Sequence, residues 1–247
     1  MDQILFHKAC NEVIHNVKIE DGIGTLSEKT IHAVIKQYLC SDNTYHEIKI
    51  HNYYADIFMD NQIIEIQTRN FDKLRSKLDV FLKEYPVTIV YPIPYYKWLR
   101  WINNETGEIS APRKSPKKGT PYMIFPELYK IKSYINHENL RLQILLINVE
   151  EYRYLNGWSK DKKKGSSRCD GIPLELIEDI TITSNEEYKK LIPNALPEEF
   201  TTKDFKKFSA LSTNGATTAV NILHHIGVIR RIGKKGRAYL YSRKLET

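Results

Sequence analysis

The chain has 247 residues, enough for one large domain or two modest ones, and its hydrophobic content of 41% excludes a disordered protein. Its formal charge of +7 is concentrated at one end, because residues 201–247 hold ten Lys or Arg and two acids, whereas the first 200 residues have a net charge of −1. A basic tail on a near-neutral body favours a polyanion partner, with nucleic acid ahead of a merely solvated end.

Nothing at the start of the sequence indicates export or a membrane anchor. No apolar segment is long enough to cross a membrane, and the first residues, MDQILFHK, lack the basic and apolar regions of a signal peptide. Cys10, Cys40 and Cys169 are odd in number and widely spaced, which favours reduced thiols. We therefore expect a cytoplasmic protein with no membrane partner.

The first 93 residues predict the order helix, strand, strand, strand, helix, strand. Thr25-Leu26-Ser27-Glu28 matches a capping box, which predicts the start of a helix that runs to residue 40. Asn70 is the candidate N-cap of the helix that ends at Pro86. The predicted strands cover Tyr45–Ile50, Tyr53–Met59, Ile63–Thr68 and residues 87–91, with Asp60-Asn61-Gln62 as the tight connection between the second and third.

Two carboxylates interrupt the apolar pattern of neighbouring predicted strands. Asp56 lies in YYADIFM and Glu65 lies in QIIEIQ. If the strands pair through the short turn, both side chains come out on one side of the sheet. Adjacent carboxylates repel each other and resist burial unless a cation lies between them. Mg²⁺ suits such a pair because it takes oxygen ligands and keeps several waters.

This arrangement resembles the PD-(D/E)XK nuclease superfamily over roughly residues 20–93. The resemblance rests on Asp56 and Glu65-Ile66-Gln67, placed on the second and third strands of the predicted unit. It implies an α/β fold with a restriction-endonuclease-like mixed sheet flanked by helices. It also implies that Asp56, Glu65 and the backbone carbonyl of Ile66 bind Mg²⁺, for which Mn²⁺ can substitute.

Two further positions follow from the same resemblance. Gln67 stands where the superfamily has its Lys, and a glutamine can position the attacking water by hydrogen bonding but cannot offset negative charge. Glu28 occupies the place of the Glu that many members supply from the preceding helix, although the capping box also explains it. The candidate catalytic residues are therefore Asp56, Glu65, Gln67 and Glu28.

Residues 95–182 predict an elaboration of the nuclease-like domain, which would span residues 1–182. The pattern indicates a hairpin at residues 97–110, a helix from Phe125 to Ile135 and a buried strand from Leu140 to Val149.

The tail, residues 184–247, predicts three helices followed by a strand, a basic turn and a strand. The second helix covers Thr202–Ser209, and the third runs to Gly227. This order resembles a small C-terminal winged helix-turn-helix domain, in which the last helix enters the major groove and the wing contacts the DNA backbone. The matching positions are Thr213, Asn214, Thr217, Thr218 and Asn221 on the helix, and Lys234, Lys235 and Arg237 on the wing.

The resemblance implies a metal-dependent DNA endonuclease, of restriction type, that hydrolyses phosphodiester bonds in double-stranded DNA. A two-fold homodimer would let each protomer cut one strand. Gln67 keeps open a non-catalytic DNA-binding regulator built on a degenerate nuclease core. The cleavage subunit of a transposase, which also joins this nuclease fold to a winged helix, is the other alternative.

Overall fold

The structure, a computed structural model, describes residues 2–20, 29–156 and 166–243 of the chain. Its α-helices are α1 (Gln3–Glu20), α2 (Lys29–Leu39), α3 (Arg75–Phe81), α4 (Phe125–Lys130), α5 (Thr202–Ser209) and α6 (Thr213–Ile226). Short 3₁₀ helices are η1 (Asn43–Tyr45), η2 (Phe71–Leu74), η3 (Pro121–Ile124), η4 (Lys132–Tyr134) and η5 (Glu186–Leu191).

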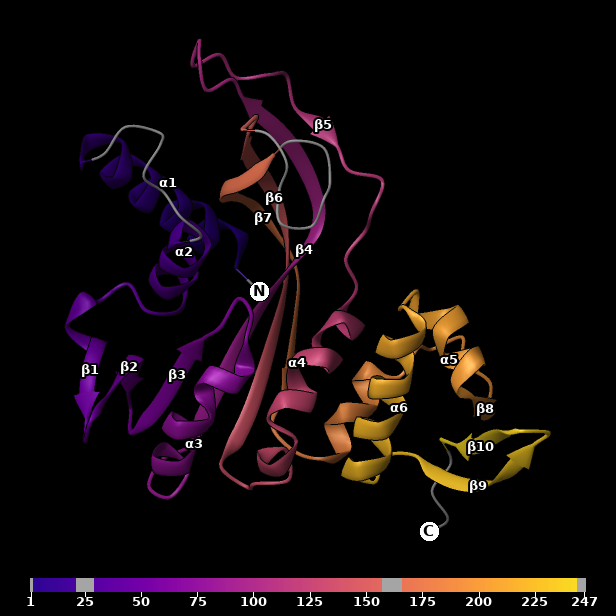
Figure 1. Cartoon of the computed structure of the whole chain (residues 1–247). Coiled ribbons are helices and arrows are strands. Elements are labelled where there is room, and N and C mark those ends of the chain that lie inside the picture. Colours follow the sequence, from indigo (N-terminus) through magenta and orange to yellow (C-terminus); the bar gives the residue numbers. More distant parts are fainter. Residues whose placement is uncertain (1, 21–28, 157–165, 244–247) are drawn as a thin grey trace. The chain divides into compact units, whose positions relative to one another are not determined.

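The strands form a seven-stranded mixed sheet and a separate three-stranded sheet (Figure 1). The large sheet contains β1 (His46–Ile50), β2 (Tyr53–Met59), β3 (Gln62–Ile66), β4 (Val87–Ile102), β5 (Arg113–Lys114), β6 (Leu140–Tyr154) and β7 (Ser167–Ile182). Its order is β1-β2-β3-β4-β6-β7, with β5 paired to β4. β2 and β3 run antiparallel whereas β3 and β4 run parallel, so the expected mixed α/β sheet is confirmed.

The chain divides into two compact units. Unit 1 comprises Met1–Ile48, Pro92–Gly119 and Leu145–Asp179, and unit 2 comprises Lys49–Tyr91, Thr120–Ile144 and Ile180–Thr247. Within unit 1, α1 packs on α2 through the edge-to-face contact of Phe6 and Tyr38, whose ring centroids are 5.3 Å apart.

Unit 2 contains the β2–β3 hairpin, α3, α4 and the whole tail. Phe71, Phe81 and Ile57 are fully buried in its core. In the tail, β8 (Glu199–Thr201), β9 (Arg230–Lys235) and β10 (Ala238–Ser242) form the three-stranded sheet in the order β8-β10-β9. α6 packs against both α5 and α4, so the tail shares its packing with a helix of the body.

The hairpin turn has the backbone geometry that its residues favour. Asp60 and Asn61 have φ values of 49° and 58°, in the left-handed region that a two-residue turn of this type requires. Asp and Asn tolerate this region better than other non-glycine residues. The turn lies where the sequence predicted it but is one residue shorter, because Gln62 already pairs with Met59 as the first residue of β3. The turn sets the register of the strands on either side.

Several predicted boundaries are wrong. The helix expected from Asn70 to Tyr85 is divided into η2 and α3, and Asn70, at φ 59°, makes no side-chain cap bond. The buried strand expected at residues 87–91 continues to Ile102, and the pattern missed β7 and β8. A run of apolar residues identifies the buried part of a strand, but the pattern is lost where the strand continues into more exposed positions.

Among the described residues, no helix is both long and apolar enough to cross a membrane. Cys10, Cys40 and Cys169 are buried and free of disulfides, as their spacing predicted.

We predict that Gly119→Ala destabilises the protein by more than about 2 kcal/mol. A Cβ at this position would lie 2.1 Å from the backbone oxygen of Pro94, which cannot move aside as a flexible side chain could. Urea unfolding would measure the loss. Gly233→Ala is the matched control, because a Cβ there meets nothing within 4 Å; equal stability of the two variants would contradict the close approach.

Candidate functional site

The β2–β3 hairpin brings Asp56 and Glu65 together. The register of β2 and β3 pairs Ile57 with Ile64 and Phe58 with Ile63. Continuing this register by one step sets Asp56 opposite Glu65, and residues directly opposite each other in an antiparallel pair share a face of the sheet. The backbone N–H of Ile66 donates to Asp56 Oδ2 at 2.7 Å, which holds the Asp56 side chain toward β3.

Glu65 is an acid in an apolar setting. The residue is 2% exposed, and desolvation, reinforced by the charge of Asp56 and opposed by Lys77, raises its pKa from 4.5 to about 7. A carboxyl group poised near neutrality gains a great deal from a nearby cation. This is the perturbed acid that a metal or catalytic site would contain.

Lys77, on α3, is a member of this charged cluster that the sequence did not reveal. Its Nζ lies 2.9 Å from Glu65 Oε1 and 2.8 Å from Glu65 Oε2, and it also donates to the backbone carbonyl of Tyr54 at 2.6 Å. The signal in the sequence was weak: Lys77 directly precedes the buried Leu78, at the edge of the apolar face of its helix. The ammonium group of Lys77 offsets the negative charge of Glu65, which the neutral amide of Gln67 cannot do.

Gln67 follows the last residue of β3 and serves the backbone instead. Its Nε2 donates to the carbonyl of Arg69, and to the carbonyl of Asn70 at 3.5 Å. The expected role of Gln67 beside the carboxylates therefore stays a prediction, and in the structure its amide supports the turn that leads into η2.

Ile66 is almost fully buried and contributes its amide to Asp56, while the role of its carbonyl as a ligand stays a prediction. Glu28 lies outside the described residues.

Within the described part of the chain, two carboxylates but not three are available for a metal ion. In residues 2–20, 29–156 and 166–243, no three His, Cys, Asp or Glu side chains gather closely enough to hold one. Asp56 and Glu65 nevertheless fit Mg²⁺, because this ion needs only one or two carboxylates when waters and substrate phosphate oxygens fill its other positions. An ion bound here would share Glu65 with Lys77.

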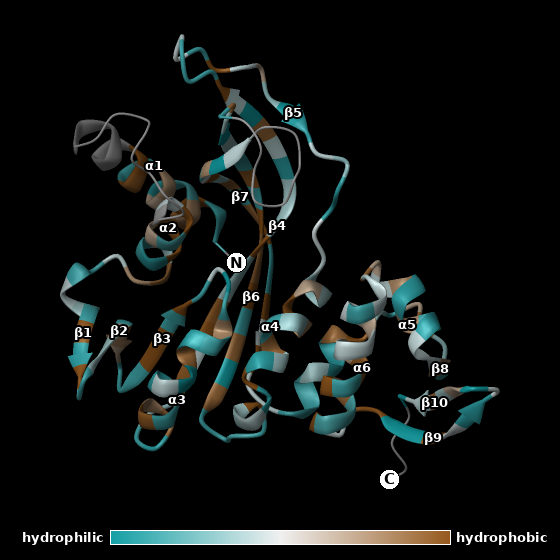
Figure 2. Cartoon of the chain, in the orientation of Figure 1, coloured by the Kyte–Doolittle hydropathy of each residue, from teal (hydrophilic) through white to brown (hydrophobic). Residues whose placement is uncertain are grey.

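The predicted DNA-binding residues of the tail lie along one face of α6. This helix begins at Ser212, whose side chain accepts from Gly215 N, and ends at Gly227, whose φ is 91°. The predicted contact residues are exposed except Thr218, which is half-buried; they are Thr213, Asn214, Thr217, Thr218 and Asn221. The opposite face of α6 is buried. Figure 2 shows both hydrophilic and hydrophobic residues along this helix.

The wing residues lie on and beside the β9–β10 hairpin. Lys234, Lys235 and Arg237 are exposed, and most of β9 is hydrophilic (Figure 2), with Ile232 as the exception. Arg231 and Lys234 lie 4.5 Å and 5.5 Å from the ring centroid of Tyr239, which supports the hairpin by cation–π contact.

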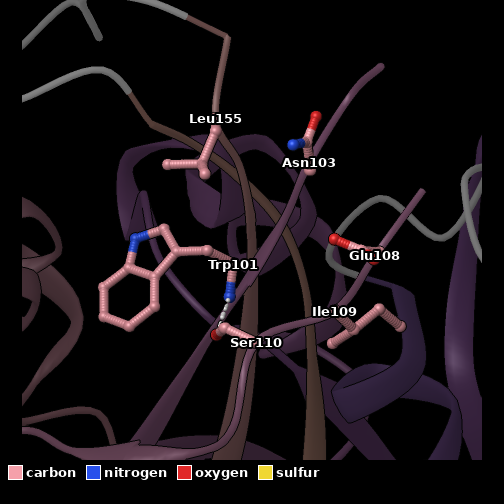
Figure 3. A pocket seen from close by; sticks show the side chains of 6 residues that line it. All are labelled: Trp101, Asn103, Glu108, Ile109, Ser110 and Leu155. Atoms are coloured by element: carbon pink, nitrogen blue, oxygen red, sulfur yellow. Dashed lines mark hydrogen bonds between the residues drawn. The ribbon is translucent and has the colours of Figure 1, made fainter. Parts of the chain in front are cut away.

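A separate hollow of about 420 Å³ lies within unit 1 (Figure 3). The backbone N–H of Trp101 donates to Ser110 Oγ at 3.0 Å beside it. Its lining residues are Trp101, Asn103, Glu108, Ile109, Ser110 and Leu155. Among the lining residues that the structure describes, Glu108 alone carries a carboxylate, so these residues offer no paired oxygen ligands for a metal.

We expect Lys77→Met to destabilise the protein by about 2–3 kcal/mol, because it leaves the Glu65 carboxylate buried without its cation. Denaturant unfolding would measure the loss. Adding Glu65→Gln should recover part of it, since the double variant lacks both charges. Lys73→Met, at an exposed lysine of η2, is the control, and a loss no larger than in this control would contradict the ion pair.

The raised pKa of Glu65 predicts a stability that falls as pH rises. Between its ordinary pKa of 4.5 and about 7, the folded chain retains a proton that the unfolded chain has released. The free energy of unfolding should therefore decrease through this window by about 3 kcal/mol at most. Urea titrations from about pH 5 to about pH 8 should show this slope in the wild type and lose it in Glu65→Gln. Parallel curves for the two proteins would contradict the shift.

Comparison with known proteins extends these observations. A family model described as "Domain of unknown function (DUF8091)" matches residues 29–183, more than half of the chain. An "Uncharacterized protein" of Treponema pallidum (strain Nichols) is 28% identical over 235 residues, covering 90% of this chain and 88% of its own length. No solved structure matches the chain. Asp56, Glu65 and Lys77 all lie in the matched region, and the chain belongs to the family described as Domain of unknown function (DUF8091).

Proposed function

We propose that this chain is a metal-dependent DNA endonuclease that hydrolyses phosphodiester bonds. The observation that carries the proposal is the pair of facing carboxylates, Asp56 and Glu65, with the ammonium group of Lys77 against the buried one. Carboxylates that share one face repel each other, so their juxtaposition favours a site for cations over a packing role.

The arrangement of elements supports a restriction-endonuclease-like core. α2, β1, β2, β3, α3 and β4 follow one another in the expected order, and the carboxylates lie on the second and third strands. β3 and β4 run parallel, with Ile63 paired to Val87 and Ile66 paired to Val90. The segment that connects these two parallel strands contains α3.

Asp56 and Glu65 would hold the Mg²⁺ ion. When bound, the ion would activate a water molecule and stabilise the charge that develops on the phosphate group. Lys77 would favour the ionised form of Glu65 and supply a positive charge beside it. Ile66 N would orient Asp56 through its hydrogen bond.

We further propose that residues 184–247 bind double-stranded DNA as a winged helix. The tail runs η5, β8, α5, α6, β9, β10, and β8 pairs with β10, which is the order expected of that fold. The exposed face of α6 and the cations of the β9–β10 hairpin would supply base-edge and phosphate contacts. A homodimer would cut both strands of the duplex.

One observation favours a second candidate, a DNA-binding regulator that does not cut. Lys77 contacts both oxygens of Glu65, so the buried carboxylate already has an internal partner without any metal. In this case the ion pair would stabilise the fold, and the tail alone would carry the function.

We expect the purified chain to nick or linearise plasmid DNA with Mg²⁺ or Mn²⁺ but not with EDTA. Asp56→Ala and Glu65→Ala should each lower the cleavage rate by roughly 100-fold or more, because each removes a metal ligand. Glu138→Ala, at an exposed acid of unit 2, should cut like the wild type.

Several plasmids and a genomic DNA should be tested, so that a missing target site is not mistaken for inactivity. Wild-type protein that binds these duplexes and cuts none of them in either metal would reject the nuclease in favour of the regulator.

A further inference from the structure

Lys132 of η4 reaches the exposed face of α6 from outside the tail. Its Nζ donates to Asn221 Oδ1 at 2.9 Å. Asn221 lies between Thr217 and His224 on the exposed side of the helix, so this contact is made on the surface proposed to meet DNA. Both Lys132 and Asn221 belong to unit 2.

The packing of unit 2 determines the position of Lys132 relative to α6. α4, which ends two residues before Lys132, packs directly on α6. Phe125 of α4 and Phe205 of α5 are both fully buried, and their ring centroids are 6.3 Å apart. Because these contacts involve core side chains, η4 is held beside α6 by more than the lysine itself.

The contact dictates which way the amide of Asn221 faces. An ammonium group only donates hydrogen bonds, so Asn221 must present its oxygen to Lys132. The Nδ2 group of Asn221 is then left to face outward with its N–H donors. With one lone pair of its oxygen taken by Lys132, Asn221 is less suited to the paired donor and acceptor contacts that read adenine than to contacts made by its N–H donors.

The positive charge of Lys132 is not neutralised by this contact. Its partner in this contact is the neutral amide oxygen of Asn221. Lys206 is similar, with its Nζ 2.9 Å from the hydroxyl oxygen of Thr213 at the start of α6. Two ammonium groups with neutral partners thus flank the exposed face of the helix.

We propose that Lys132 and Asn221 form one DNA-reading pair that presents mainly hydrogen-bond donors to the major groove. The base edge that matches is guanine, whose N7 and O6 are both acceptors. Lys132 is the positioning residue for Asn221 and adds a positive charge that the tail alone does not contain. This inference rests on the proposed DNA binding by the tail.

The test is a binding selection with the full-length chain in EDTA, using short duplexes with a randomised centre. We expect the wild type to enrich guanine at one position, and Lys132→Met to lose about five-fold or more of that preference. The slope of log affinity against log KCl concentration should also decrease by about 1, because one cation is lost from the interface.

Lys189→Met is the matched control, since it removes a lysine of the same unit that is ion-paired with Glu186 at 2.9 Å. Thermal unfolding of each variant would verify folding. The inference would be overturned if Lys132→Met kept the guanine preference and the salt slope of the wild type. It would also be overturned if Lys189→Met lost as much of both as Lys132→Met. Either outcome would leave the proposed DNA binding intact. A loss of affinity that is the same for all sequences would overturn the orienting role. A wild type that binds no duplex would overturn the proposed DNA binding together with this inference.

Discussion

The burial of Glu65 is the constraint on which the centre of unit 2 depends. A carboxylate that is 2% exposed, with a second carboxylate facing it, is costly without a cation. The Asp60–Asn61 turn sets the register that opposes Asp56 to Glu65, and α3 supplies Lys77 within hydrogen-bond distance of both Glu65 oxygens. Turn geometry, strand register and the position of α3 therefore satisfy one electrostatic requirement together.

The same ion pair connects the two candidate functions. An internal cation compensates the buried Glu65 carboxylate when no metal is present. Lys77 lies on a short helix and its side chain is 24% exposed, so the ion pair is not sealed from solvent. A structural role for the pair in the free chain is thus compatible with a catalytic role in the loaded one.

The sequence predicted local features better than distant partners. The strand Tyr53–Met59 and the helix Thr202–Ser209 have strong local patterns, and the structure has them with the same bounds. The turn at the first two residues after Met59 was also predicted, although Gln62 belongs to β3 and not to the turn. The facing of Asp56 and Glu65 follows from strand parity and a short turn, so it was also predictable. Lys77 was not, because a lysine beside an apolar helical face is common and only tertiary packing shows which acid it meets. β7 was missed because exposed residues interrupt its apolar pattern, as its burial pattern shows.

The packing of α4 on α6 also bears on how this protein can evolve. The family model ends at residue 183, which would suit a tail that recombination could exchange for another domain. Yet Phe125 of the body and Phe205 of the tail share one core, and the alignment with the Treponema pallidum protein covers too much of the chain to stop before the tail. Exchanging the tail for an unrelated module would leave an uncovered apolar helix behind. Body and tail should therefore be inherited together, and changes at their shared core should occur in compensating pairs.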